Sequence, residues 1–190
     1  ADVFASANAR QMGVAIEAGR VVSGTQQAFV RNRLGVIYPA DNPAGLTQLA
    51  DLSKPGLKLI LAAAEVPVGQ YSLDFMDKAT QDPTFGPGYK DAVLQNVVSY
   101  EDNVRSVLAK ISLGEGDAGI VYTSDISGAE RDQVGQIDIP DELNTIATYP
   151  IAVISDAIHP SHAQVFVDYI LSPAGQAVLT KYGFISVSKL

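Results

Sequence analysis

The fold of this chain is decided by the stretch from Leu57 to Gly69, which reads LKLILAAAEVPVG. Its first part is almost wholly apolar and short, which is typical of a strand buried on both faces of a sheet. A helical pattern follows, because apolar residues recur on one face from Val68 to Ala79. Pro67 suits the first helical position, where its missing N–H costs nothing. The stretch therefore predicts a buried strand that leads directly into a helix.

A turn of this kind is a place where an anion can bind. The first backbone N–H groups of a helix lack acceptors within the helix, and the positive end of the helix dipole lies behind them. Most such turns in α/β proteins bind nothing. The N–H near Val68 is therefore a candidate donor only if other strand ends offer matching groups.

Strands alternate with helices along the rest of the chain, which indicates an α/β protein with a largely parallel sheet. One helix is expected within 43–52, and another is expected to be capped by Ser161, with Phe166, Tyr169 and Ile170 on one face. Extended stretches around 31–38 and 145–154 flank the middle of the chain. We interpret them as crossings between two lobes.

Composition excludes several classes of protein. The 190 residues suffice for one substantial core or two small lobes, and 47% hydrophobic with 18% charged residues is ordinary for a soluble globular protein. No run approaches the length of a membrane span, and no signal peptide is visible, so we expect a cytosolic protein or a mature or trimmed product. The absence of Cys excludes disulfides and thiolate metal sites. A net charge of −8 with scattered Lys and Arg argues against nucleic acid.

Two further strand ends carry candidate donors. The segment from Ser99 to Val104 repeats the pattern of a strand, a tight turn and a helix start, and offers the N–H of Val104. Anion binding there requires the acidic Glu101 and Asp102 to turn away. The buried strand that ends in Tyr122 offers a hydroxyl, although such a side chain also commonly caps a core with its OH in water.

Ligands of open α/β sheets gather outside the carboxyl ends of the strands. The three candidate donors there are neutral, and the nearby Arg105 is more typical of a solvated helix residue. Neutral donors suit an anion that is fully desolvated and recognised by its size. The sequence therefore favours a binding protein for a small anion.

An enzyme would need a base, a nucleophile or a metal constellation. His159 and His162 flank a Pro-Ser pair, which is more typical of a solvated helix start than of a metal site. Glu65 is the best-placed carboxylate and has no identified partner. We predict no catalytic residue, no metal ligand and no cofactor.

Seven segments resemble the periplasmic molybdate-binding proteins of ABC transporters. In the order of that family, and along nearly the whole chain, they are residues 1–7 (ADVFASA), 31–34 (RNRL), 65–69 (EVPVG), 101–105 (EDNVR), 119–122 (GIVY), 149–153 (YPIAV) and 172–176 (SPAGQ). No single motif is specific, and the resemblance rests on all seven together.

The resemblance implies a type II periplasmic binding protein fold, with two α/β lobes of mostly parallel sheets and an oxyanion between them. The lobes would be residues 1–33 with 149–190, and residues 34–148. Val68 and Val104 would each give a backbone N–H, and Tyr122 its hydroxyl. The ligand would be molybdate or tungstate, the partner an ABC transporter membrane permease, and the location periplasmic or extracytoplasmic.

The chain departs from the family at its start. The family has two serine-bearing segments before the one that matches Ala1, and Ser6 matches neither ligand serine. We therefore expect an incomplete, truncated first lobe that lacks part of the oxyanion shell. Its open sheet edge should pair or swap with a second copy of the chain.

Two alternatives stay open. The same fold serves as an oxyanion-sensing effector module of some transcription regulators, although no helix-turn-helix is present in these residues. A receptor for another anion such as sulfate is the other alternative, because sulfate and molybdate differ mainly in size. Molybdate and tungstate are nearly identical in size, so the sequence does not separate them.

Overall fold

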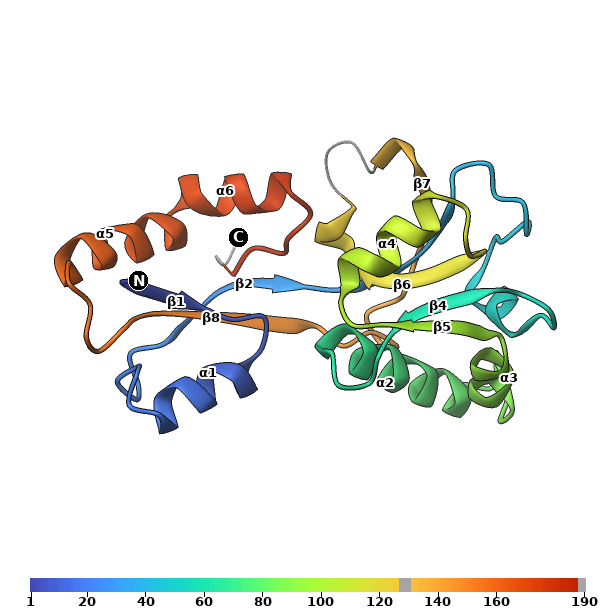
Figure 1. Cartoon of the computed structure of the whole chain (residues 1–190), viewed down its shortest axis with the longest axis horizontal. Coiled ribbons are helices and arrows are strands. Elements are labelled where there is room, and N and C mark those ends of the chain that lie inside the picture. Colours follow the sequence, from blue (N-terminus) through green and yellow to red (C-terminus); the bar gives the residue numbers. More distant parts are fainter. Residues whose placement is uncertain (127–130, 188–190) are drawn as a thin grey trace. The chain divides into compact units, whose positions relative to one another are not determined.

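Two compact units make up the chain in the computed structural model, which describes residues 1–126 and 131–187 (Figure 1). Unit 1 consists of Ala1–Asn32 and Ile146–Leu190. Unit 2 consists of Arg33–Thr145.

Unit 2 contains a five-stranded mixed sheet in the order β5-β4-β6-β3-β7. The strands are β3 (Leu34–Pro39), β4 (Leu59–Ala62), β5 (Val97–Glu101), β6 (Ala118–Tyr122) and β7 (Val134–Asp138). β4 lies between β5 and β6 and is parallel to both, whereas β3 runs antiparallel to β6 and β7. Every residue of β4 and β6 is buried, as expected for their continuous apolar sequences. The carboxyl ends of β4, β5 and β6 therefore lie at one edge of the sheet.

Helices cover both faces of this sheet. Figure 1 shows α2 (Pro67–Gln81) on one face and α4 (Val104–Ser112) on the other. Both helices bury an apolar stripe, which includes Phe75 and Met76 of α2 and Val107 and Ile111 of α4. α3 (Tyr89–Gln95) packs beside α2 and the 3₁₀ turn η1 (Leu49–Ser53), and the short turn η2 (Thr123–Asp125) follows β6.

Unit 1 is built on a three-stranded antiparallel sheet in the order β1-β8-β2. The strands are β1 (Val3–Ala5), β2 (Gln27–Asn32) and β8 (Ala147–Val153). α1 (Ala9–Glu17) lies on one face and buries Met12 against Ala152. α5 (Pro160–Leu171) and α6 (Pro173–Lys181) lie on the other face (Figure 1).

The α/β class is confirmed, but the expectation of mostly parallel sheets is wrong in detail. All pairs in unit 1 are antiparallel, and in unit 2 only the two pairs that involve β4 are parallel. The error has a physical cause: a continuous apolar run reports burial of both faces and carries no information on strand direction. β3 is almost entirely buried although both its neighbours are antiparallel.

Two helix predictions also need correction. The helix expected within 43–52 is only the turn η1, because Asn42, at φ 45°, binds both the N–H and the carbonyl of Leu46 and closes a separate turn. α5 begins at Pro160 after His159, one residue before the expected cap. Its predicted apolar face is not a core face, since Phe166 and Tyr169 are half exposed and Ala163 and Val167 are buried instead.

Candidate functional site

The three donors predicted from sequence lie in unit 2, at the ends of neighbouring strands. Val68 belongs to the first turn of α2, which follows β4, and Val104 begins α4, which follows β5. Tyr122 is the last residue of β6. Because β5, β4 and β6 are adjacent and parallel, all three residues belong to the same edge of one sheet.

The start of α2 leaves backbone donors without acceptors. Val66 precedes the helix in an extended conformation and provides no side-chain cap, and Pro67 occupies the first helical position. The carbonyl of Val66 accepts the N–H of Gln70 at 3.0 Å. The N–H groups of Val68 and Gly69 donate to no acceptor in the described ranges 1–126 and 131–187. These two donors are therefore available to an anion.

Gly69 explains how the first turn of α2 lies so close to the end of β4. A Cβ at this position would collide with the carbonyl oxygen of Ala63 and would lie 2.5 Å from that of Ala62. The absence of a side chain at Gly69 therefore permits the close approach of the helix start to the strand end. Gly69 belongs to the sequence motif at 65–69, but the pattern alone does not reveal its steric role.

The start of α4 is capped differently. The Asn103 side-chain oxygen accepts the N–H of Ser106 at 2.9 Å, as a regular N-cap does. The cap leaves the N–H groups of Val104 and Arg105 without an acceptor among the residues that the structure describes. α4 thus offers the same kind of free donors as α2.

Glu101 is turned to the flank of α4. Its Oε1 atom lies 2.6 Å from Lys110 Nζ and accepts the hydroxyl of Ser99, also at 2.6 Å. The hydrogen bond from Lys110 is the main reason that the pKa of Glu101 is below its usual range. Asp102 is exposed. One of the two carboxylates that had to turn away is therefore held by a specific partner.

Tyr122 is buried, with 6% of its surface exposed, and the half-buried carboxyl group of Asp125 lies next to its backbone. Its N–H donates to Asp125 Oδ2 at 3.2 Å. Burial raises the pKa of Asp125 to about 6, although the hydrogen bond from Tyr122 and the charge of Arg105 act in the opposite direction.

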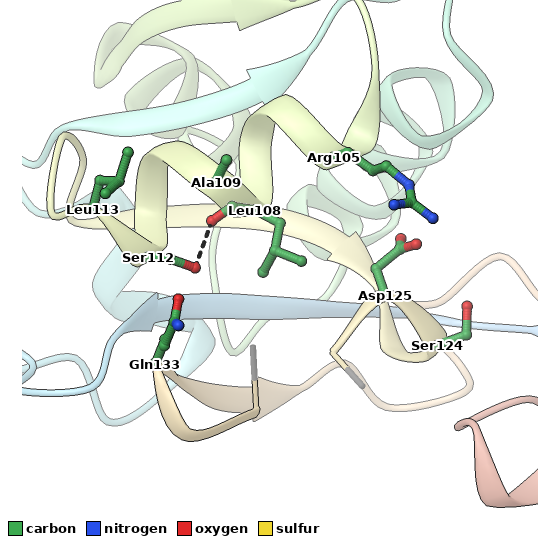
Figure 2. Close-up of a pocket in the computed structure, with 8 residues that line it drawn as sticks. All are labelled: Arg105, Leu108, Ala109, Ser112, Leu113, Ser124, Asp125 and Gln133. Carbon is green, nitrogen blue, oxygen red and sulfur yellow. Dashed lines mark hydrogen bonds between the residues drawn. The ribbon is translucent and has the colours of Figure 1, made fainter. Parts of the chain in front are cut away.

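A cavity of about 460 Å³ runs along α4 from this end of the sheet (Figure 2). Its lining residues are Arg105, Leu108, Ala109, Ser112, Leu113, Ser124, Asp125 and Gln133. Figure 2 shows Arg105 and Asp125 at one end of the cavity and Leu113 at the other. Sequence reasoning missed Asp125, and the only local signal was a polar Thr-Ser-Asp run after a buried strand.

The two histidines lie in unit 1 and make an ordinary surface contact. His159 Nδ1 is 3.2 Å from a carboxylate oxygen of Asp2, whose other oxygen accepts the N–H of Ile158. The His159 and His162 rings are 6.1 Å apart between centroids. Through its contacts with Ile158 and His159, Asp2 links the start of β1 to the start of α5.

In the described part of the chain, no three His, Asp or Glu side chains are grouped so that they could hold a metal ion.

Comparison with known proteins identifies the family. Residues 1–185 match the family model of the bacterial extracellular solute-binding proteins. The molybdate-binding protein ModA of Mycobacterium tuberculosis is 32% identical over 184 residues, which cover 97% of this chain and 65% of the relative. The chain thus spans slightly less than two thirds of that relative's length.

Solved structures give the fold. The substrate binding domain of a putative molybdenum ABC transporter from Clostridium difficile is 29% identical with a TM-score of 0.76, covering 98% of this chain and 77% of that one. The periplasmic molybdate-binding protein of Azotobacter vinelandii is 16% identical with a TM-score of 0.79, covering 98% and 79%. This likeness confirms the expected periplasmic binding protein fold. Among the described residues, no helix is both long and apolar enough to cross a membrane. The chain belongs to the bacterial extracellular solute-binding proteins.

Proposed function

We propose that this chain is part of the substrate-binding component of an ABC importer and that its ligand is molybdate or tungstate. The observation that carries the proposal is the pair of helix starts at one sheet edge, where the N–H groups of Val68 and Val104 have no acceptor among the described residues. The names of the M. tuberculosis relative and of both similar structures support the choice of anion.

The chemistry of the donors fits a small, fully ionised anion. Backbone N–H groups at helix starts are fixed in direction and bring the positive ends of two helix dipoles toward one place. In the proposal, Tyr122 adds its hydroxyl as a third neutral donor. Neutral donors recognise the anion without adding a countercharge, so discrimination depends on size and on the number of hydrogen bonds. Sulfate, which has the same shape and charge, is the alternative ligand.

The proposed partner is a membrane permease, and the proposed location is outside the cytoplasm. The protein would release the anion to the permease and perform no catalysis. We further propose that unit 1 is an incomplete lobe that self-associates, because among the described residues β1 has a partner strand on one side only.

The test is a titration of the 190-residue chain with molybdate, tungstate and sulfate up to millimolar concentration. Binding is measured by calorimetry and by ¹⁵N NMR. We expect molybdate and tungstate to shift the amide resonances of Val68 and Val104. Tyr122→Phe should weaken binding roughly tenfold, the effect of losing one hydrogen bond to a charged group. Tyr100→Phe is the matched control, since Tyr100 is 56% exposed on β5.

The two parts of the proposal can fail separately. If neither amide responds to any of the three anions, the proposed function is wrong. If the anion binds and Tyr122→Phe binds as tightly as the parent, only the role of Tyr122 is wrong.

A further inference from the structure

Glu101 occupies a position from which its carboxylate could compete with an anion. It is the last residue of β5, two positions before the N-cap Asn103 of α4. Its backbone carbonyl accepts the N–H of Ala63, just past the end of β4, at 2.8 Å. The backbone of Glu101 therefore lies at the end of β5, beside the end of β4, and these two strands lead to Val104 and Val68.

A free carboxylate in this position would oppose anion binding in two ways. It would repel an anion at the same edge of the sheet. It would also be attracted to the N–H of Val104 and to the helix dipole, as acidic side chains at helix starts are. An intramolecular carboxylate of this kind would occupy the donors that an anion needs.

The side chain of Lys110 prevents this arrangement. Lys110 lies on α4 near its C-terminal end, and its ammonium group binds Glu101 at 2.6 Å and Ser99 at 3.3 Å. Ser99 donates to the same Glu101 oxygen. The carboxylate is thereby directed along the flank of α4, with its side chain only 12% exposed, against 34% for Lys110.

We propose that Lys110 is a positioning residue of the anion site, which holds and neutralises the Glu101 carboxylate so that the N–H of Val104 stays free. This inference rests on the proposed function. The low pKa of Glu101, caused first by the hydrogen bond from Lys110, agrees with it. The ion pair of Lys110 and Glu101 therefore does more than stabilise the fold. Removal of Lys110 should weaken anion binding because it releases the Glu101 carboxylate, and not only because it deletes a positive charge.

The test is a set of variants titrated with molybdate. Lys110→Met should raise the Kd roughly five- to tenfold, because the released Glu101 carboxylate competes with the anion for the same donors. The double variant Lys110→Met with Glu101→Gln should restore the parent Kd, because the competing charge is gone. Lys90→Met is the matched control, since Lys90 forms a pair of the same length, 2.6 Å, with Asp77 away from the strand ends. It should leave the Kd unchanged.

A second measurement needs no ligand. In anion-free Lys110→Met, the amide resonance of Val104 should shift with pH as Glu101 ionises. In the parent this contribution should be smaller and occur at lower pH, because the hydrogen bond from Lys110 directs the carboxylate away and lowers the pKa of Glu101. In the double variant it should be missing, because no carboxylate is present at position 101. Urea unfolding of each variant separates this effect from a loss of stability.

The outcomes are distinct. A Lys110→Met chain that binds like the parent, or a double variant that stays as weak as Lys110→Met, overturns the role of Lys110 while the proposed function stands. A parent chain that binds none of molybdate, tungstate and sulfate overturns the proposed function and this inference with it.

Discussion

Gly69 is the residue whose replacement should most clearly disturb the start of α2. Any Cβ at this position collides with the carbonyl oxygen of Ala63, which is backbone and cannot move aside without displacing β4 or α2. We expect Gly69→Ala to lower the free energy of unfolding by about 1–3 kcal/mol, the usual cost of overpacking. It should also weaken anion binding, because the N–H of Val68 moves with the helix.

The matched control is a helical glycine with space around it. Gly13 lies in α1, and a Cβ there would meet nothing within 4 Å. Gly13→Ala should be neutral or stabilising by up to about 1 kcal/mol, since alanine is the better helix former. Urea unfolding of both variants is the measurement. Equal unfolding midpoints for the two would show that the turn accommodates the methyl group and would refute the steric role.

Asp125 should make stability depend on pH in the direction opposite to most carboxylates. Its pKa is raised from 3.8 to about 6 in the folded chain, mainly by burial. Between these values the folded state holds the proton more tightly than the unfolded state, so the free energy of unfolding falls as pH rises through this window. Asp125→Asn removes the charge and keeps an oxygen that can accept the N–H of Tyr122.

The measurement is urea unfolding of the parent and of Asp125→Asn at a series of pH values from about 4 to 7. The variant should gain stability relative to the parent as pH rises, and the difference should level off above the raised pKa of about 6. Parallel stability curves for the two proteins would mean that Asp125 is well solvated when it is charged.

At the scale of elements, helix starts could be predicted from sequence because their signals are local. Pro67 marks the start of α2, and Ser172 with Pro173 marks the start of α6, where the Ser172 hydroxyl accepts the N–H of Gly175. Strand direction could not be predicted in this way. The extended stretch expected around 31–38 is divided between β2 of unit 1 and β3 of unit 2, and no local pattern marks that division.

The same distinction between local signals and tertiary packing applies to the residues of the candidate site. Val68, Val104 and Tyr122 could be placed together from sequence, because each lies at or just after a strand end and β4, β5 and β6 are in fact parallel neighbours. The partners Lys110 and Asp125 could not. The contact of Lys110 depends on how α4 packs over the sheet, which a linear pattern does not encode. Asp125 is only three residues from Tyr122, whose N–H it accepts, but the burial that raises its pKa comes from tertiary packing.

At the scale of the whole molecule, unit 1 has surfaces that a second copy can cover. The outer edge of β2 is partly protected, since Arg31 forms a bridge with Ile185. Within the described residues no strand pairs with the outer edge of β1. Large apolar side chains are also exposed on α5 and α6, just before α5 and just after α6: Ile158, Val165, Phe166, Tyr169, Val178 and Tyr182. An unprotected edge together with exposed apolar side chains favours association.

We expect sedimentation velocity at micromolar concentration to show a dimer of the chain. The double variant Val165→Ser with Phe166→Ser should shift it to monomer, because these residues are 67% and 51% exposed and contribute little to the core. Val98→Ser is the matched control, since Val98 is 59% exposed on β5 of unit 2 and is not part of the proposed interface. A clean monomer of the parent chain would refute self-association. A dimer that resists the double variant but is weakened by Val98→Ser would instead place the interface on unit 2.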